Sequence, residues 1–136
     1  MFNTGKYRRQ TIGSDSPAHF FSANSETTEV REQIAKSLLN TMLDWISDSG
    51  DVAIFDATNS RISRRRNVLR LCAMRAPELS VVFIESICYD RAELARNLLT
   101  KCRLSPDYKN MQENDTMDDL RQQISHYEAQ YEPIRC

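Results

Sequence analysis

Glycine and proline are scarce in this sequence, which has three glycines and four prolines among 136 residues. So few of these residues exclude a collagen-like or low-complexity protein. The apolar residues, 40 % of the chain, never form a run approaching the roughly 20 that cross a bilayer, which excludes a membrane-spanning helix. The opening MFNTGKYRRQ has no apolar core and no cleavage site. We therefore expect no secretory signal and a cytoplasmic protein.

Metal-binding patterns are missing as well. The four cysteines, at positions 72, 88, 102 and 136, include no C-x-x-C pair, and the two histidines lie far apart. We therefore expect no zinc site. In the reducing cytosol we expect the thiols to be free.

The charges nearly cancel, with 18 Lys and Arg against 19 Asp and Glu, for a net charge of −1. No overall basic field favours nucleic acid or a membrane surface. The cations are mostly arginine, at 14 against four lysines. Arginine binds phosphate or carboxylate through two parallel hydrogen bonds, so this skew indicates oxyanion binding, although codon bias produces the same composition.

Helical and strand patterns alternate within a length that suits one domain. Apolar spacing predicts helices over residues 25–49, 63–75 and 90–104, and a last helix that carries residues 117–131. Two short apolar runs, 52–55 and 81–84, predict parallel strands buried on both faces. The segment FNTGKYRR predicts a strand end followed by a polar loop that continues through residues 13–17. The fold class predicted is α/β, a mostly parallel sheet covered by helices.

Ligands in such sheets bind outside the carboxyl ends of the strands, where Asp56 and Cys88 lie. A carboxylate at the end of a buried strand suits a Walker-B role, holding Mg²⁺, and it also suits accepting a proton from an attacking hydroxyl. An aspartate that caps the following turn has the same pattern. A nucleophilic Cys88 needs a base or cation nearby, and the pattern favours a structural thiol instead.

Arginines cluster at the start of the predicted helix over residues 63–75, as Arg64-Arg65-Arg66. The helix dipole disfavours cations there, by a few tenths of a kcal/mol each, roughly. A bound phosphate offsets that cost, and so do neighbouring glutamates or solvent. If the fold brings Arg8, Arg31 and Arg64 to one rim, the three form a pocket for a sugar phosphate. Tyr127 and Tyr131 recur at helical spacing, which predicts core packing for both.

Taken together, several segments resemble the kinase domain of 6-phosphofructo-2-kinase/fructose-2,6-bisphosphatase, in order and approximate spacing, over essentially the whole chain. They are FNTGKYRR, Phe20-Phe21, VAIFDATN, VFIESICYD, Asn97, SPDY and YEAQYEPI. The resemblance implies a partial kinase domain over residues 1–136 with a P-loop NTPase-type parallel sheet and flanking helices. It also implies ATP-dependent phosphorylation of fructose 6-phosphate to fructose 2,6-bisphosphate, with Mg²⁺.

The same resemblance assigns roles to single residues. Asp56 would be the essential carboxylate near Mg²⁺ and the 2-hydroxyl, and Cys88 matches a cysteine of the family's active site. Asn97 begins a segment that reaches the nucleotide, and Lys101 lies in that segment. The residues implied in sugar-phosphate binding are Arg8, Arg31, Thr58, Arg64 and Tyr127.

Three departures from the family pattern stand out. No G-x-x-x-x-G-K-T motif occurs, and Met1 directly precedes the FNTGKYRR segment, so the strand and loop that carry this motif in the family are lacking. Cys102 stands where the family has a lysine, with Lys101 and Arg103 beside it, and Gln123 stands where the family has an arginine. Without the central strand, we expect the chain to be inactive alone, and to be poorly stable or paired with something else, as a homodimer or on an intact kinase.

The beginning at Met1 favours a truncated gene or a degenerate copy, two readings that the residues leave open. Two other functions also remain. One is a non-catalytic protein that binds a sugar phosphate or docks on an intact kinase. The other is a kinase relative acting on nucleic-acid 5′-hydroxyls, against which the near-neutral charge argues.

Overall fold

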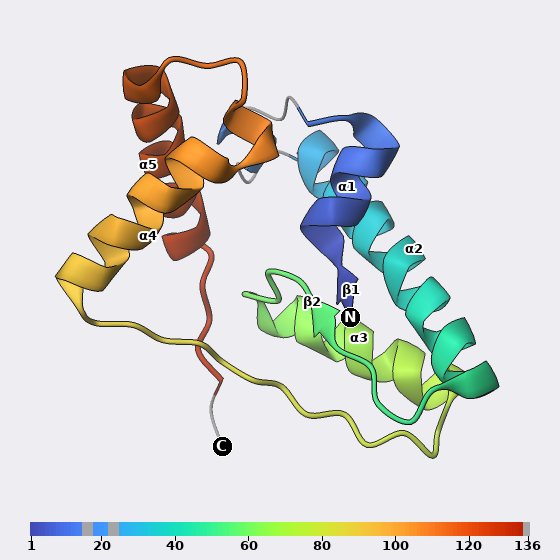
Figure 1. Cartoon of the computed structure of the whole chain (residues 1–136). Coiled ribbons are helices and arrows are strands. Elements are labelled where there is room, and N and C mark those ends of the chain that lie inside the picture. Colours follow the sequence, from blue (N-terminus) through green and yellow to red (C-terminus); the bar gives the residue numbers. More distant parts are fainter. Residues whose placement is uncertain (15–17, 22–24, 135–136) are drawn as a thin grey trace.

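The chain is described here by a computed structural model, over residues 1–14, 18–21 and 25–134 (Figure 1). The α/β class is confirmed: the described part is mostly helical, with one two-stranded parallel sheet. The P-loop type of the sheet stays a prediction. The elements in order are β1 (Phe2–Asn3), α1 (Thr4–Ile12), η1 (Ala18–Phe21), α2 (Ser25–Ser49), β2 (Phe55–Asp56), α3 (Ile62–Arg75), α4 (Arg91–Leu104), η2 (Pro106–Tyr108) and α5 (Glu113–Glu128).

The larger core forms where α2 and α3 pack against the two strands. Its buried residues recur three and four apart along each helix, as the apolar spacing predicted. They are Leu39, Met42, Leu43, Val68, Cys72 and Ala76. At the end of α2 the ring of Trp45 packs against Gly50, where a Cβ would collide with the ring, so glycine is required at that position.

The two strands are short but fix the centre of the molecule. Phe2 pairs with Phe55 and Asn3 with Asp56, and the Phe2 N–H donates to the Ile54 carbonyl at 2.8 Å. Parallel pairing places the carboxyl ends of both strands at the same edge. Asn3 and Asp56 therefore lie side by side where α1 begins.

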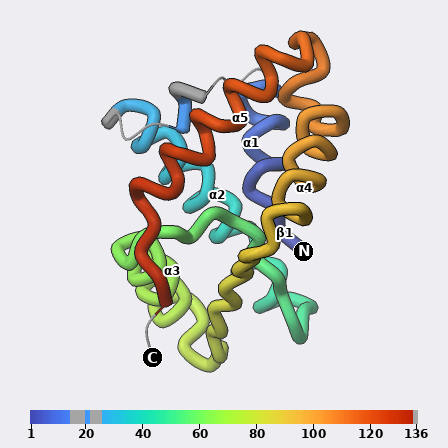
Figure 2. The backbone as a smooth tube through the Cα atoms, turned by 90° about the vertical axis from the view of Figure 1, so that its left-hand side faces the viewer, coloured from blue at the N-terminus to red at the C-terminus, as the bar shows by residue number. Residues whose placement is uncertain are grey.

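A second, smaller core lies between α4 and α5, which run alongside each other in Figure 2. Its buried residues are Cys102, Tyr108 and Leu120. Asp90 caps α4, because its Oδ1 accepts from the N–H groups of Ala92 at 2.8 Å and Glu93 at 3.1 Å. In the described part of the chain, no helix combines the length and apolar content that crossing a membrane requires.

The strand predicted at residues 81–84 is wrong, and the one at 52–55 shrinks to Phe55–Asp56. Residues 76–90 instead run as a separate length of chain between α3 and α4 (Figure 1). A groove of about 940 Å³ lies between residues 51–60 and 78–86. Among the described residues, no strand across this groove pairs with residues 81–84. The side chains of Val82 and Ile84 are 79 % and 91 % exposed. A strand pattern without a hydrogen-bonding neighbour does not form a strand.

Two further predictions are corrected. Residues 4–12 form α1 rather than a polar loop, because Asn3 caps the helix by accepting the Lys6 N–H at 2.7 Å. This helix buries only Arg8, so its sequence carries no apolar periodicity. Helix α5 ends at Glu128, before Tyr131, which is 46 % exposed and donates its hydroxyl to Glu85 instead of packing in the core. Residues 15–17 of the predicted loop and the thiol of Cys136 lie outside the described residues.

Candidate functional site

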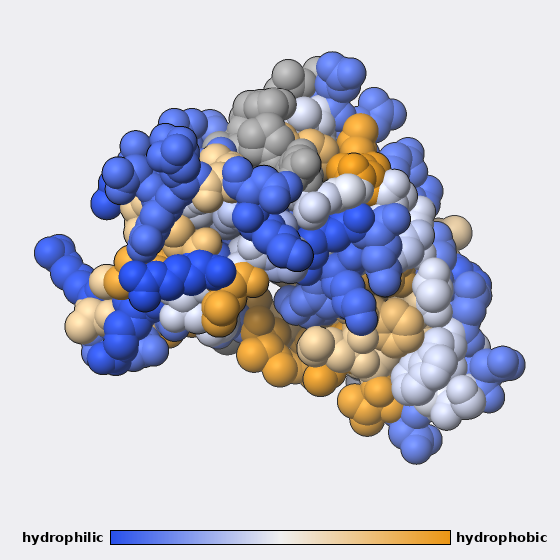
Figure 3. All heavy atoms as spheres, turned by 45° about the horizontal axis from the view of Figure 1, so that its top comes forward, coloured by the Kyte–Doolittle hydropathy of each residue, from blue (hydrophilic) through white to orange (hydrophobic). Residues whose placement is uncertain are grey.

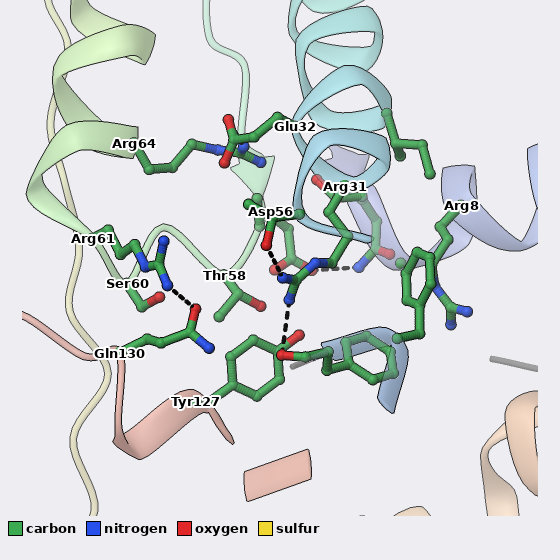
Figure 4. Close-up of a pocket in the computed structure, with 18 of the residues that line it drawn as sticks. Arg8, Arg31, Glu32, Asp56, Thr58, Ser60, Arg61, Arg64, Tyr127 and Gln130 are labelled. Carbon is green, nitrogen blue, oxygen red and sulfur yellow. Dashed lines mark hydrogen bonds and ion pairs between the residues drawn. The ribbon is translucent and has the colours of Figure 1, made fainter. Parts of the chain in front are cut away.

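A pocket of about 430 Å³ opens at the carboxyl end of β2 (Figure 4). Its walls come from α1, η1, the first turns of α2, the segment from β2 into α3, and the end of α5. The sequence analysis required that Arg8, Arg31 and Arg64 come to one rim, and all three line this pocket. Six residues singled out from the sequence line this pocket: Arg8, Arg31, Asp56, Thr58, Arg64 and Tyr127.

Asp56 ends β2 and is held on the pocket wall by its strand neighbour. The side-chain amide of Asn3, the residue paired with it in the sheet, donates to Asp56 Oδ2. Asn3 therefore caps α1 with its oxygen and orients the carboxylate with its nitrogen. The carboxylate is exposed at the pocket, where it can accept a hydrogen bond from a ligand hydroxyl.

Arg8 is the most deeply buried arginine of the pocket. Its Nη2 donates to both carboxylate oxygens of Asp107 at 2.8 Å, and its guanidinium lies 5.6 Å from the centre of the Phe21 ring. These contacts give a physical reason for the SPDY and Phe20-Phe21 segments, because both enclose Arg8. Arg8 Nη1 is buried without a hydrogen-bond partner in the described structure, so neighbouring side chains have to shift before a ligand oxygen can reach this donor.

Arg31 is fixed at the start of α2. It donates to the Phe21 carbonyl at 3.0 Å, the Thr27 carbonyl at 3.2 Å and the Thr28 hydroxyl at 2.9 Å. Burial lowers the pKa of its guanidinium, and the neighbouring cations Arg61 and Arg64 act in the same direction. Because arginine keeps its charge in proteins, this lowered pKa marks an electrostatic environment that a bound anion would relieve.

Tyr127 closes the pocket from the side of α5, with its ring 5.9 Å from that of Phe21. Burial raises the pKa of its hydroxyl, while the hydrogen bond with Thr58 and the charges of Arg31 and Arg8 pull the pKa down. The hydroxyl stays protonated at neutral pH and is available as a donor. Tyr127 and Thr58 thus present two hydroxyl groups to the same space (Figure 4).

The three arginines at the start of α3 have three different environments. Arg64 faces the pocket and forms an ion pair with Glu32 of α2. Arg65 is buried and donates to the carbonyls of Asn59 and Glu132, each at 2.9 Å. Arg66 is exposed. The helical phase of α3 therefore decides which arginine can bind a ligand.

The sequence reasoning did not single out Arg61, Gln130 or Glu32, which also line the pocket. Arg61 donates to Gln130, and Glu132 accepts the Ile62 N–H at 2.6 Å. Residues 130–132 are therefore hydrogen-bonded to the start of α3. Single polar residues in loops carry no periodic signal. The arginine and tyrosine spacing in the sequence could not reveal them.

The walls carry a strong excess of positive charge. The described lining holds the arginines at 8, 9, 31, 61 and 64 against the carboxylates of Glu32 and Asp56, and Asp107, just outside the lining, pairs with Arg8 and Arg9. The remaining polar groups are hydroxyls and amides. A small, hydroxyl-rich anion fits this combination, in a cavity of the size usual for small-molecule sites.

Three residues predicted from the resemblance do not line this pocket. Cys88 is exposed, with its Sγ 3.9 Å from the Asp90 carbonyl. Asn97 is exposed on α4, and Lys101 donates to Gln123 at 3.1 Å. Cys102, beside Lys101, is buried in the α4–α5 core. Roles for Cys88, Asn97 and Lys101 stay predictions.

The described residues do not by themselves fit a nucleotide. The 136 residues contain no G-x-x-x-x-G-K-[ST] loop to surround phosphates. No group of three or more His, Cys, Asp or Glu side chains gathers around a metal position within the described ranges. Asp56 supplies one oxygen ligand, which suits only a Mg²⁺ held otherwise by phosphates and water.

Comparisons with known proteins show the family of this chain. The 6-phosphofructo-2-kinase family model matches residues 1–135. The chain is 36 % identical over 135 residues to an Arabidopsis thaliana 6-phosphofructo-2-kinase/fructose-2,6-bisphosphatase, covering 98 % of this chain and 18 % of that protein. Identity is also 36 % over 140 residues to 6-phosphofructo-2-kinase 1 of Saccharomyces cerevisiae, covering 98 % and 17 %.

A human relative, 6-phosphofructo-2-kinase/fructose-2,6-bisphosphatase 3, is 36 % identical over 136 residues, which cover 98 % of this chain and 26 % of that protein. The chain spans about a sixth to a quarter of the length of these three relatives. The family match extends over nearly every residue of the chain. On this evidence the chain belongs to the 6-phosphofructo-2-kinase family.

Proposed function

We propose that the arginine-lined pocket binds fructose 6-phosphate and forms the sugar-phosphate part of a 6-phosphofructo-2-kinase site. The observation that carries this proposal is the convergence of Arg8, Arg31, Asp56, Thr58, Arg64 and Tyr127 on one cavity of about 430 Å³. These residues come from five separate parts of the chain, so their meeting is a property of the fold. The family membership supports the choice of sugar phosphate.

In this proposal the phosphate of the sugar lies against the guanidinium groups. Arg64 is only 14 % exposed and Arg31 is already oriented by three hydrogen bonds, so neither loses much freedom on binding. Arg8 would add its Nη1 as a donor once the side chains that cover this atom move aside. Hydrogen bonds between a guanidinium and a phosphate are about twice as strong as neutral ones. The arginines therefore supply most of the affinity.

The sugar hydroxyls would meet the uncharged and acidic groups. Thr58 and Tyr127 offer hydroxyls, and Asp56 accepts from the hydroxyl that the family phosphorylates, the 2-hydroxyl of the ketose. Asn3 holds the Asp56 carboxylate in place for this contact. Asp56 thereby orients the hydroxyl and is the group to take its proton.

Turnover requires a nucleotide-binding part that these 136 residues do not include. ATP and Mg²⁺ supply the phosphoryl group and its charge neutralisation in the family reaction, and only Asp56 here suits the metal. We therefore assign phosphorylation to a longer protein or an assembly that provides this part. The arginine-lined pocket, in a sequence without a phosphate loop, favours a second candidate for the chain alone, which is binding without catalysis.

Isothermal calorimetry on the whole chain tests the proposal with four ligands: fructose 6-phosphate, inorganic phosphate, fructose, and a 5′-hydroxyl oligonucleotide. We expect fructose 6-phosphate to bind more tightly than inorganic phosphate, and fructose to bind weakest. Circular dichroism on the same sample establishes that the chain is folded. A folded sample without heat of binding at millimolar fructose 6-phosphate contradicts the proposal, and tight salt-dependent oligonucleotide binding would replace it by the nucleic-acid alternative.

A further inference from the structure

Glu32 is one of two acidic side chains in the described lining of the pocket, which also holds five arginines. It projects from α2 next to Arg31 in sequence and forms an ion pair with the Nη1 of Arg64 across the pocket (Figure 4). The Arg64 side chain is 14 % exposed, whereas that of Glu32 is 48 % exposed. The carboxylate is therefore more open to solvent than the guanidinium that it contacts.

The other carboxylate of the pocket differs from Glu32 in its partners. Asp56 is held by the neutral amide of Asn3, and its position at the end of β2 is fixed by the sheet. Glu32 is held by an arginine that the proposed ligand also needs, and its charge also acts on Arg31. Two anions near one guanidinium repel each other strongly where water is partly excluded. A phosphate that binds Arg64 therefore competes with Glu32 for the guanidinium and is repelled by its charge.

We propose that Glu32 sets the affinity of this pocket for phosphate, by holding the Arg64 guanidinium until the phosphate of the ligand replaces it. This inference rests on the proposed function, because it concerns the same pocket. The Glu32 carboxylate keeps Arg64 directed into the empty pocket and lowers the net positive charge that any anion meets. Release of an anion is also easier, because the Glu32 carboxylate can form its ion pair with Arg64 again.

The half-exposed position of Glu32 makes this role separable from folding. Ion pairs exposed to water contribute little to stability, so removing the charge of Glu32 leaves the fold intact. The effect is confined to anions, because a neutral sugar neither competes with Glu32 for Arg64 nor is repelled by it. Inorganic phosphate and fructose 6-phosphate should respond alike, and fructose should not respond.

The test compares Glu32→Gln with Glu29→Gln in the whole chain. Glu29 is an exposed residue of the same helix that does not line the pocket, so its variant carries the same change in net charge. We expect calorimetry to show about fivefold tighter binding of fructose 6-phosphate and of inorganic phosphate to Glu32→Gln, from the loss of one competing ion pair. Glu29→Gln should change either affinity less than about twofold, and fructose binding should not change.

Phosphate affinities that are unchanged or weaker in Glu32→Gln, with a wild-type chain that binds both ligands, overturn this inference and leave the proposed function standing. If neither the wild type nor the variants bind a phosphate ligand while circular dichroism shows them folded, both are wrong. If only Glu32→Gln binds, the inference holds and the wild-type affinity is weaker than the proposed function requires. Equal gains in Glu32→Gln and Glu29→Gln overturn the inference too, because net charge alone then explains the change.

Discussion

The arginine-lined pocket and the groove between residues 51–60 and 78–86 share Asp56, Ala57, Thr58 and Ser60 but differ in how they are held. In the pocket, charged side chains from distant segments pair with one another, as Arg8 does with Asp107 and Arg64 with Glu32. In the groove, extended chain and apolar side chains such as Val82 and Ile84 face open space. In Figure 3, hydrophobic side chains gather at the lower middle of the molecule, below a hydrophilic region.

The difference shows which interactions a partial α/β domain can keep. Ion pairs and side-chain hydrogen bonds need two residues, so the pocket forms wherever α1, α2, α3 and α5 are brought together. A strand needs backbone partners along its whole length. The pocket is therefore better formed than the sheet beside it, and the following predictions, from the largest effect to the smallest, test this contrast.

Hydrogen exchange should separate the two regions most clearly. Backbone amides at residues 81–87 form no hydrogen bond among the backbone bonds of the described structure, so we expect exchange within about tenfold of the unprotected rate. Amides in the buried turns of α2, at residues 38–43, should exchange at least about 1,000 times more slowly. Mass spectrometry of peptic peptides measures both in one sample. Equal protection in the two segments would show that 81–87 is paired in solution and would remove the contrast.

Replacing Arg8 by alanine should lower the free energy of unfolding severely. The change leaves Asp107, 14 % exposed, with only the longer contact to Arg9 at 3.3 Å. Breaking a buried pair by removing one partner costs about 3–5 kcal/mol in the free energy of unfolding. Urea unfolding followed by circular dichroism measures this loss. The matched variant is Arg9→Ala, whose side chain is 29 % exposed and which should cost about 1 kcal/mol or less. Similar losses in both variants would contradict the role given to Arg8.

Arg64→Gln should weaken fructose 6-phosphate binding without unfolding the chain. Loss of one charge-assisted contact to phosphate corresponds to about 1.5–3 kcal/mol, or roughly 10- to 100-fold in affinity. The neighbouring Arg66→Gln removes the same charge from an exposed position that does not line the pocket, and we expect less than about a threefold change. Calorimetry on both variants measures the two affinities for fructose 6-phosphate. Equal weakening would mean that net charge, and not the pocket, attracts the ligand.

Alkaline pH should destabilise the chain through Tyr108, which is buried in the α4–α5 core. Burial, and then the hydrogen bond of its hydroxyl to Asp119 at 3.0 Å, raises the pKa of Tyr108. Because the unfolded chain releases this proton near pH 10 and the folded chain retains it, the free energy of unfolding falls above that pH. The loss is up to about 1.4 kcal/mol per pH unit.

Urea midpoints between pH 8 and 11 measure this slope. Tyr108→Phe should flatten it, whereas Tyr89→Phe, at a residue 88 % exposed, should leave the slope of the wild type. Identical slopes for the two variants would show that Tyr108 does not hold its proton in the folded chain.

Part of the pocket lining could be predicted from the sequence because those residues follow elements with strong signals. Asp56 and Thr58 come directly after an apolar run, and Arg31 and Arg64 lie in the first turns of periodic helices. The carboxyl end of a parallel strand and the starts of neighbouring helices meet at one edge in an α/β fold. Whether Arg64 or Arg65 faces the ligand depends on the exact phase of α3, which a pattern of three adjacent arginines does not contain.

The absence of a strand at residues 81–84 could not be predicted from those residues alone. Its composition fits a strand buried on both faces, but that composition describes the environment the segment suits, and a strand also requires a neighbour. Helix α1 was missed for the opposite reason. It lies on the surface around a single buried arginine, so capping by Asn3 determines it rather than apolar periodicity.

The most direct test of the central claim is a nuclear magnetic resonance titration of the isotope-labelled chain with fructose 6-phosphate. The account predicts that backbone shifts change at the pocket, with the largest changes near Thr58, Arg64 and Tyr127, while residues 81–87 stay unaffected. Shift changes concentrated in the groove or on α4, with none at Thr58 and Arg64, would contradict the claim that this pocket binds the sugar phosphate.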